Sequence, residues 1–465
     1  MKTKWHNVTL MVVVLSFLVA EWAAADIYQW EWVDPSDHSQ GKRQSSTLCP
    51  EGAGVSATPG ADLHFLDLTQ AYLDNTNLSS ARLDGTTLAN ADLGSASMGH
   101  AWLEGATLVN ANLSNTYFVN AHLKDADFTG ATVTWAFFQH IDFYAFDFAA
   151  SQLYSTASYR SHDLRGIKFR GWPGCDLAGQ NLTGADLSDS DLTGATLANA
   201  DLSGANLMSA ILTDATLTNV DLMWSMLFGS RFDNANLTNA DLSFTDLNGA
   251  ILTNANLTNA DLSMACLDSA TLTNATLINA NLSDANFYRA DLTGADLRGA
   301  RAADLSSAIV RSTILPTGHI QGLILDAGEA LVVRDCALPI VVENEMNLGP
   351  GSTLRMLFDS SSWSSTIAFD YGIPVTLGGD LDLSFATDGW DTKGATYHLF
   401  DWRGVTPNGQ FRLVAHQTSE GYWDTSQLYT TGNVTYVPEP SAFALLGVGA
   451  LGLLAYGRRR WQRAA

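Results

Sequence analysis

The chain has 465 residues, with 24 lysines and arginines against 48 aspartates and glutamates, and its formal net charge is −24. This acidic balance argues against direct binding to nucleic acid, because neutralising phosphates requires a basic surface. A hydrophobic content of 46% excludes a disordered acidic tail. The four cysteines are too few for a disulfide-dense fold and have no Cys-x-x-Cys spacing, so no structural zinc site is expected. Their pairing stays open; they are Cys49, Cys175, Cys266 and Cys336.

The first 25 residues have the features of a secretory signal peptide. Two lysines precede the apolar run 8–20, and the small residues 23–25 precede Asp26. The run has 13 residues, whereas a membrane span needs roughly 20. We therefore expect export and cleavage after residue 25 rather than an uncleaved anchor.

The middle of the chain repeats with a period of five residues. From Leu177 to Leu297 every fifth residue is large and apolar, and alanine fills 18 of the 25 positions two residues before these centres. Steps of five residues would turn successive centres by about 140° around an α-helix, and they would place them on alternate faces of a strand. The pattern therefore predicts a chain that turns a corner in every unit, so that all centres point to one interior.

An earlier block has the same repeat in another phase. It occupies residues 61–155 and has 19 centres, of which Leu153 is the last. Residues 156–175 break the phase before the second block, 176–304. Neither block contains proline, which would remove a donor from a strand ladder. Residues 26–60 are predicted to cap the first coil, because an open coil end exposes its core.

The repeated unit, as in Ala260-Asp261-Leu262-Ser263, resembles the pentapeptide-repeat family over about residues 61–300. The resemblance implies an all-β fold, a right-handed quadrilateral β-helix with four units in each coil. In that fold the centre and the small residue two positions before it point inward. A small β-rich domain is expected to follow.

Residues 20 apart in the repeat share one column of the surface, and the residue before each centre, Asp296 among them, is expected to point outward. Four carboxylates at one-coil spacing are candidate calcium ligands, because calcium prefers oxygen. The alternative is a solvated ladder whose carboxylates accept hydrogen bonds from nearby turn amides. The candidate ladder is Asp201, Asp221, Asp241 and Asp261. A second ladder is predicted to be structural, since asparagine tolerates positive φ; it is Asn199, Asn219, Asn239, Asn259 and Asn279.

Residues 135–154 form an aromatic cluster that we expect to fill the interior where the solenoid breaks, with a sugar-stacking platform as the alternative. Trp102 and Trp224 are expected at outward positions, and Cys175 at an inward one. The ten histidines form no His-Glu-x-x-His motif. Neither a Gly-x-Ser-x-Gly motif nor a glycine-rich phosphate loop is present. We therefore expect no enzyme, no catalytic residues and no cofactor.

Residues 305–437 read as a β-rich domain, because short alternating runs are separated by glycine and proline turns. The stretches 318–335 and 373–385 resemble the solenoid passengers of autotransporters. The predicted strands are Ile320–Leu325, Leu331–Arg334, Ile340–Glu343, Leu354–Phe358, Leu381–Phe385, Tyr397–Trp402 and Phe411–Ala415.

The last segment, residues 438–465, has three parts in order. Pro438, Glu439 and Pro440 precede an apolar membrane segment, 442–456, and an arginine cluster follows. The cluster comprises Arg458, Arg459 and Arg460. Arginines favour the cytoplasmic side of a membrane. The order resembles the PEP-CTERM sorting signal, which implies a transient inner-membrane anchor and removal by exosortase, a membrane protease.

These features predict an exported structural or adhesive protein of the cell surface or extracellular matrix, with exosortase as partner and exopolysaccharide as a second candidate partner. One alternative is a polysaccharide-binding solenoid, with a lyase less favoured because few bases accompany the acids. Another is an acidic DNA-mimic inhibitor of gyrase, which fits the charge and not the signal peptide.

Overall fold

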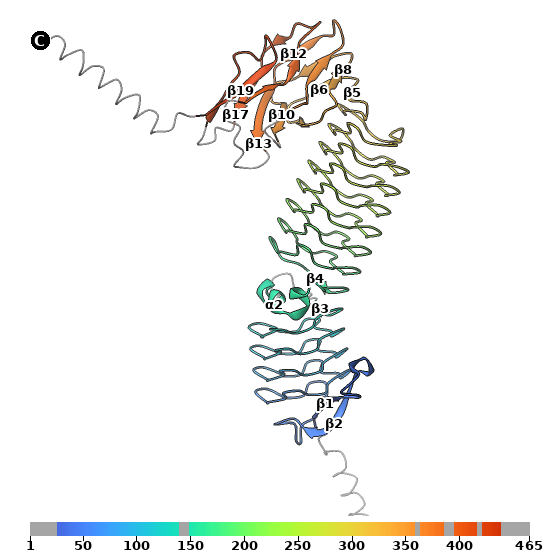
Figure 1. Ribbon diagram of the computed structural model, residues 1–465, viewed down its shortest axis with the longest axis vertical. Helices are drawn as coiled ribbons and strands as arrows, with labels where there is room; N and C mark the ends of the chain where they lie inside the picture. Colours follow the sequence, from blue (N-terminus) through green and yellow to red (C-terminus); the bar gives the residue numbers. More distant parts are fainter. Residues whose placement is uncertain (1–25, 139–147, 359–362, 386–394, 416–420, 439–465) are drawn as a thin grey trace, which may run out of the picture. The chain divides into compact units, whose positions relative to one another are not determined.

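The computed structural model describes residues 26–138, 148–358, 363–385, 395–415 and 421–438 (Figure 1). The chain divides into two compact units: residues 1–251 with 261–267, and residues 252–260 with 268–465. We call these the N-terminal and C-terminal units. The predicted signal peptide and the membrane segment 442–456 lie outside the described residues. Within the described ranges, no helix combines the length and the hydropathy that crossing a membrane requires.

The structure is mostly β, with few helices, and the predicted β-solenoid is confirmed. In the N-terminal unit the named elements are β1 (Tyr28–Trp32), η1 (His38–Gln40), β2 (Lys42–Leu48), β3 (Phe137–Phe138), α2 (Ala150–Ser155), α3 (Ala157–Arg160) and β4 (Lys168–Phe169). In the C-terminal unit they are β5 (His319–Ile320), β6 (Leu323–Leu325), β7 (Ala330–Arg334), β8 (Ile340–Val342), β9 (Met346–Leu348), β10 (Thr353–Phe358), β11 (Ile367–Phe369), β12 (Val375–Leu377), β13 (Asp380–Phe385), β14 (Thr396–His398), β15 (Phe400–Asp401), β16 (Asn408–Gly409), β17 (Arg412–Ala415), β18 (Gly421–Asp424) and β19 (Asn433–Pro438).

Each five-residue unit of the solenoid makes one short bridge and one corner. The unit around Leu182 is representative: Leu182 N donates to Asp201 O of the next coil at 2.6 Å, and Ala185 N donates to Leu182 O at 2.9 Å. The third residue of that turn, Gly184, has φ of 66°. A four-residue turn with positive φ at its third position is the type II pattern, which favours glycine or asparagine there. The centre Leu182 and Ala185 are fully buried, so the inward positions predicted from the repeat are confirmed.

Residues 26–60 lie against the first coil through backbone hydrogen bonds. The antiparallel pair β1 and β2 docks where Trp30 N donates to Gln70 O at 3.0 Å and Tyr72 N donates to Tyr28 O at 2.8 Å. Glu51 N likewise donates to Asp67 O at 3.0 Å. The segment therefore covers polar edge groups of the coil that a bare solenoid end would expose.

The phase break contains two short helices that the repeat pattern did not predict (Figure 1). Leu153, predicted as the last centre of the first block, is buried but belongs to α2. The local sequence explains this, because Gln152 caps the amide of Ala149 at 2.6 Å and Thr156 accepts from Tyr159 N at 3.1 Å. The coil then resumes where β3 pairs in parallel with β4.

The β-rich region of the C-terminal unit is itself a coiled stack of parallel strands. Three four-stranded parallel sheets run β15-β11-β8-β5, β16-β12-β9-β6 and β17-β13-β10-β7. Equivalent apolar residues lie in register, as when Leu331, Leu354 and Leu381 pair in successive strands and are all buried. A small antiparallel sheet, β14-β19-β18, completes the region.

Two of the predicted strands are longer than the strands in the structure. Ile320–Leu325 splits into β5 and β6, and Tyr397–Trp402 splits into β14 and β15. Burial gives the reason for the second, since Tyr397, Leu399 and Phe400 are all buried, and two consecutive inward residues require a bend. A strand with uninterrupted alternation could not bury both Leu399 and Phe400 in one core.

Candidate functional site

The predicted aspartate ladder forms a continuous column in the N-terminal unit. Asp201, Asp221 and Asp241 bridge in parallel to the next member of the column. Each carboxylate accepts from the backbone two residues on: Asp201 Oδ1 from Ser203 N at 3.0 Å, Asp221 Oδ1 from Met223 N at 2.9 Å. Asp241 and Asp261 accept equivalent bonds at 2.9 Å and 2.8 Å. The ladder therefore closes the turns of its own coils.

The asparagine column also stabilises the turns. Asn219 Nδ2 donates to Asn199 Oδ1 at 3.0 Å, and Asn239 Nδ2 donates to Asn219 Oδ1 at 3.0 Å. All three residues have φ between 57° and 59°. Asparagine is thus used here for its tolerance of the left-handed conformation and for a side-chain ladder between coils, as predicted.

Among the described residues, no group of three or more histidine, cysteine or acidic side chains is arranged to hold a metal ion. The four cysteines are free thiols. Burial, followed by the charge of Asp67, raises the pKa of the Cys49 thiol to about 11, and burial also raises the pKa of Cys175. Both stay protonated near neutral pH and pack as small apolar residues, which confirms the inward position predicted for Cys175.

The aromatic cluster predicted at 135–154 divides between the core and the surface. Phe138 and Phe148 are buried and stack at 4.1 Å between ring centroids, and Phe118 continues that stack at 5.0 Å from Phe138. Trp135, in contrast, is 48% exposed. Residues 139–147 lie outside the described residues. The interior assignment therefore holds for Phe138 and Phe148, and Trp135 belongs to the surface.

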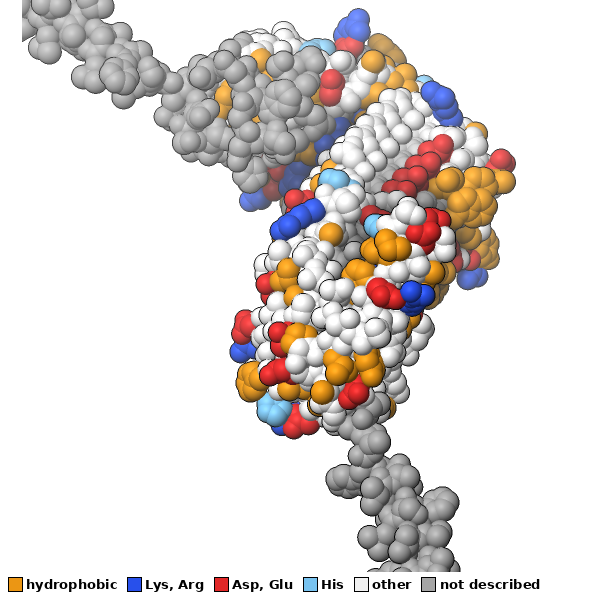
Figure 2. Space-filling model, turned by 60° about the horizontal axis from the view of Figure 1, so that its bottom comes forward, with side chains coloured by type: hydrophobic (Ala, Val, Ile, Leu, Met, Phe, Trp, Pro, Cys, Tyr) orange, Lys and Arg blue, Asp and Glu red, His pale blue; other side chains and the backbone are white. Residues whose placement is uncertain are grey.

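Large apolar side chains gather on the surface of the second block beside the aspartate ladder. Figure 2 shows hydrophobic side chains clustered next to a row of acidic ones on one face. Trp224 is 60% exposed, as its outward position predicts, and stacks on Phe244 of the next coil at 4.3 Å. Other exposed apolar residues nearby in the repeat include Met208, Met226, Phe228 and Met264.

Sequence reasoning identified Trp224 and missed its neighbours. The sequence feature that could have identified the neighbours is the corner position two residues after a centre. Trp224, Phe244 and Met264 occupy this position with φ of 60°, 58° and 61°. That position otherwise takes asparagine, glycine, aspartate or serine in most units. A bulky residue there is unfavourable for the turn, so its presence marks a surface that folding alone does not explain.

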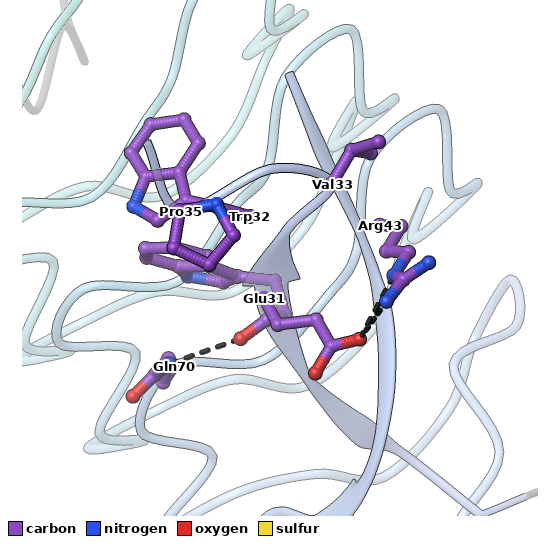
Figure 3. Close-up of a pocket in the computed structure, with 7 residues that line it drawn as sticks. Glu31, Trp32, Val33, Pro35, Arg43 and Gln70 are labelled. Atoms are coloured by element: carbon purple, nitrogen blue, oxygen red, sulfur yellow. Dashed lines mark hydrogen bonds and ion pairs between the residues drawn. The ribbon is translucent and has the colours of Figure 1, made fainter. Parts of the chain in front are cut away.

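The N-terminal segment contributes a separate hollow of about 460 Å³ (Figure 3). Trp30, Trp32 and Pro35 give it apolar walls, and Glu31 and Arg43 lie at its edge. Arg43 Nε donates to Glu31 at 2.8 Å. Trp32 stacks on His38 at 3.9 Å, and Gln70 donates to Trp30 O at 3.0 Å. The polar groups of the hollow are thus engaged within the protein.

The predicted sorting motif begins at the end of the last strand. Pro438 is the final residue of β19 and pairs with Gly421 of β18. Glu439, Pro440 and the arginines Arg458, Arg459 and Arg460 lie outside the described residues. The first proline of the motif therefore closes the central strand of the antiparallel sheet β14-β19-β18.

Two family descriptions match the chain. Pentapeptide repeats match in segments between residues 60 and 301, namely 60–94, 71–108, 106–143, 174–207, 185–222, 235–274 and 265–301. The PEP-CTERM protein-sorting motif matches residues 437–460. No curated protein matches the chain.

Solved structures of other repeat proteins are also similar. HetL, a pentapeptide repeat protein involved in heterocyst differentiation regulation from the cyanobacterium Nostoc sp. strain PCC 7120, is 26% identical over 53% of this chain and 90% of its own, with a TM-score of 0.24. A pentapeptide repeat protein of the Arabidopsis thaliana thylakoid lumen is 30% identical over 26% of this chain and 70% of its own, with a TM-score of 0.14. QnrB1, a plasmid-mediated fluoroquinolone resistance protein, is 14% identical over 51% of this chain and 92% of its own, with a TM-score of 0.18.

Proposed function

Because this chain belongs to the pentapeptide-repeat family and ends in a PEP-CTERM sorting motif, we propose that it is a structural or adhesive protein of the cell surface or extracellular matrix. The motif implies export and processing by exosortase. In particular, we propose that the processed protein acts as a non-catalytic scaffold that holds cells or matrix polymers together. The single observation that carries it is the sorting motif at residues 437–460, which begins at the end of β19.

The solenoid surface supports a non-catalytic role. The outward aspartates and asparagines described above form hydrogen bonds with turn amides or with one another. We therefore assign them a role in stabilising the coils rather than in acid or base catalysis. Proteins of the pentapeptide-repeat family are generally not enzymes. Exposed apolar area on an exported, otherwise polar surface favours contact with another molecule.

We do not favour gyrase inhibition. The acidic charge suits a DNA mimic, but gyrase is cytoplasmic and the sorting motif implies export. The alternative of polysaccharide binding has a specific observation behind it, the exposed stack of Trp224 on Phe244.

The test uses a strain without the gene, complemented with the full-length protein or with the Glu439→Ala variant. Surface-exposed protein is measured by protease treatment of intact cells, and cohesion by the settling of cell aggregates. We expect the full-length protein to restore both the surface signal and cohesion. We expect the variant to restore neither, because it stays in the inner membrane. Wild-type cohesion in the strain without the gene would contradict the adhesive role.

A further inference from the structure

One corner column of the N-terminal unit runs continuously across the phase break. Trp135 N donates to Arg165 O at 2.8 Å, Gly184 N to Ser203 O at 3.1 Å, and Trp224 N to Ser243 O at 3.2 Å. These bonds join neighbouring coils at the same corner. The column, which we call the aromatic corner, comprises Trp135, Gly166, Gly184, Gly204, Trp224 and Phe244.

The bulky members of the aromatic corner occupy a conformation that disfavours them. Trp135, Trp224 and Phe244 have φ of 60°, 60° and 58°, where an L-residue loses stability and glycine does not. All three side chains are exposed, so burial in the core does not offset this cost. Strained exposed aromatic residues point to a function of the surface.

The glycines of the aromatic corner leave one face of the Trp224 ring uncovered and make room for the Trp135 ring. Phe244 stacks on one side of Trp224, and on the other side lies Gly204, with no atom within 4 Å of where its Cβ would be. The ring of Trp135 lies over Gly166, where a Cβ would clash with it, and extends to 3.5 Å from the Cβ position of Gly184. The two tryptophans are four coil steps apart, about 19 Å at the usual strand spacing. An extended sugar chain of several residues can span this distance and place the C–H face of one sugar on each ring.

The charge beside the aromatic corner selects the kind of sugar. Asp201, Asp221 and Asp241 precede the corner residues of their coils by three positions. In the described part of the chain, none of the three forms an ion pair with a lysine or arginine. In Asp221 and Asp241 the turn amide donates to Oδ1. Oδ2 of each carboxylate can therefore accept a hydrogen bond from a ligand. Carboxylates stacked one coil apart repel one another and any anionic polymer, and they attract a positively charged polymer.

We propose that the aromatic corner binds a polysaccharide carrying protonated amino groups, with sugar rings on Trp135 and Trp224 and ammonium groups along the aspartate ladder. This inference rests on the proposed surface function and names its partner. The aromatic rings provide the contact area, and the carboxylates discriminate against neutral and acidic polysaccharides.

The test measures binding of three hexasaccharides to the full-length protein by titration calorimetry in calcium-free buffer. The probes are the hexamer of glucosamine, the hexamer of N-acetylglucosamine and a hexuronate. We expect the glucosamine hexamer to bind at least tenfold more tightly than its acetylated counterpart, and no binding of the hexuronate. The affinity for the glucosamine hexamer should fall as salt rises.

The variants use residues that the same repeat positions already contain. Trp224→Gly copies Gly204, and Phe244→Asn copies the asparagines found at other corners, so the turn is kept. Together they should weaken binding of the glucosamine hexamer at least tenfold. Asp221→Asn with Asp241→Asn keeps a turn acceptor, as Asn236 accepts from Thr238 N at 3.2 Å. This double variant should bind the glucosamine hexamer no more tightly than it binds the acetylated hexamer.

A matched control is Trp102→Thr, which removes an exposed tryptophan stacked on His122 at 4.1 Å in a different column. It should bind as the unaltered protein does. Unchanged binding by the Trp224→Gly, Phe244→Asn variant, or equal affinity of the unaltered protein for both hexamers, would overturn the inference. If cohesion in the complemented strain persists in that case, the proposed function stands while its partner is wrong. If the protein never reaches the surface, the proposed function fails whatever the calorimetry shows.

Discussion

Arg298 and Asp296 form a fully buried ion pair in the C-terminal unit, with Nη2 of Arg298 2.6 Å from Oδ2 of Asp296. The guanidinium also donates to Leu338 O at 2.9 Å, to Ser365 Oγ at 2.8 Å and to Arg334 O at 2.9 Å. It therefore joins the last coils of the pentapeptide repeat to the strands of the three-sheet region, with its donors satisfied by charge and by backbone.

Replacing this arginine should strongly destabilise the C-terminal unit. Arg298→Met leaves Asp296 buried without its partner, which should cost about 3–5 kcal/mol of unfolding free energy. Arg231→Met is the matched control, because Arg231 is exposed and its partner Asp233 is only half-buried, so that the pair should be worth about 0–1 kcal/mol. Denaturant unfolding measures both. Equal losses in the two variants would show that the buried pair is not a special stabiliser.

The burial of Asp296 was not predictable from the repeat alone. Its position before a centre was expected to point outward, and it does leave the coil interior, but the strands that follow cover it. The period of five predicts which residues of each unit point into the coil interior. It does not predict which other segments pack against the outer surface. The stack of Trp224 on Phe244 likewise depends on two neighbouring coils, although the corner position of each residue is set by its own unit. The helix at Leu153 was missed because capping by Gln152 and Thr156 prevailed over the repeat pattern.

The coil interior should reject larger side chains. Ala255 is fully buried at the inward small position, so Ala255→Leu should overpack the core and cost about 1–3 kcal/mol. Ala198→Leu, at a half-buried position just after a centre, should change the midpoint of thermal unfolding little. An unchanged midpoint for Ala255→Leu would show that the register of the repeat is wrong.

Calcium should act on the aspartate ladder only by general screening. Each carboxylate closes its own turn with Oδ1, a role that asparagine can also fill. Millimolar calcium should therefore shift the melting temperature equally in the unaltered protein and in a variant with Asp201, Asp221, Asp241 and Asp261 all changed to Asn. A rise confined to the unaltered protein would demonstrate specific binding, which stabilises by mass action.

The pair of Asp380 in β13 and Arg412 in β17 should give a pH-dependent contribution to stability. Hydrogen bonds from the Arg412 guanidinium, at 2.7 Å and 2.5 Å, hold the pKa of Asp380 below its usual value of 3.8. Because the folded-state pKa is the lower one, the stabilisation is complete above the usual value and is lost as pH falls through the folded-state pKa. The pair is worth little, since Arg412 is largely exposed and salt screens it.

The measurement compares the melting temperatures of the unaltered protein and Asp380→Asn across acid pH. The difference should be small near neutrality, should shrink as the pH falls through the usual carboxyl pKa, and should vanish below the lowered folded-state pKa of Asp380. Arg412→Gln should behave in the same way, and the double variant should lose no more than either single one. A difference that grows as the pH falls would contradict the assigned direction.

The three parts of the sorting tail should have separable effects on processing. Glu439→Ala should leave uncut protein in the membrane, because the segment between the prolines is the part offered to the protease. Replacing Arg458, Arg459, Arg460 and Arg463 by Ser should weaken retention, because a guanidinium stays charged and is costly to move across lipid. Full-length protein should then leak past the protease. Membrane and released fractions, separated and probed for both ends of the chain, distinguish these outcomes.

The most direct measurement is the mass of the released protein from the unaltered strain. Export and exosortase processing predict a chain that lacks residues 1–25 and ends near Pro438, Glu439 and Pro440, with none of the arginine cluster. Such a protein is free to reach the surface or the matrix. Released protein that still ends at Ala465 would contradict the processing on which the surface role depends.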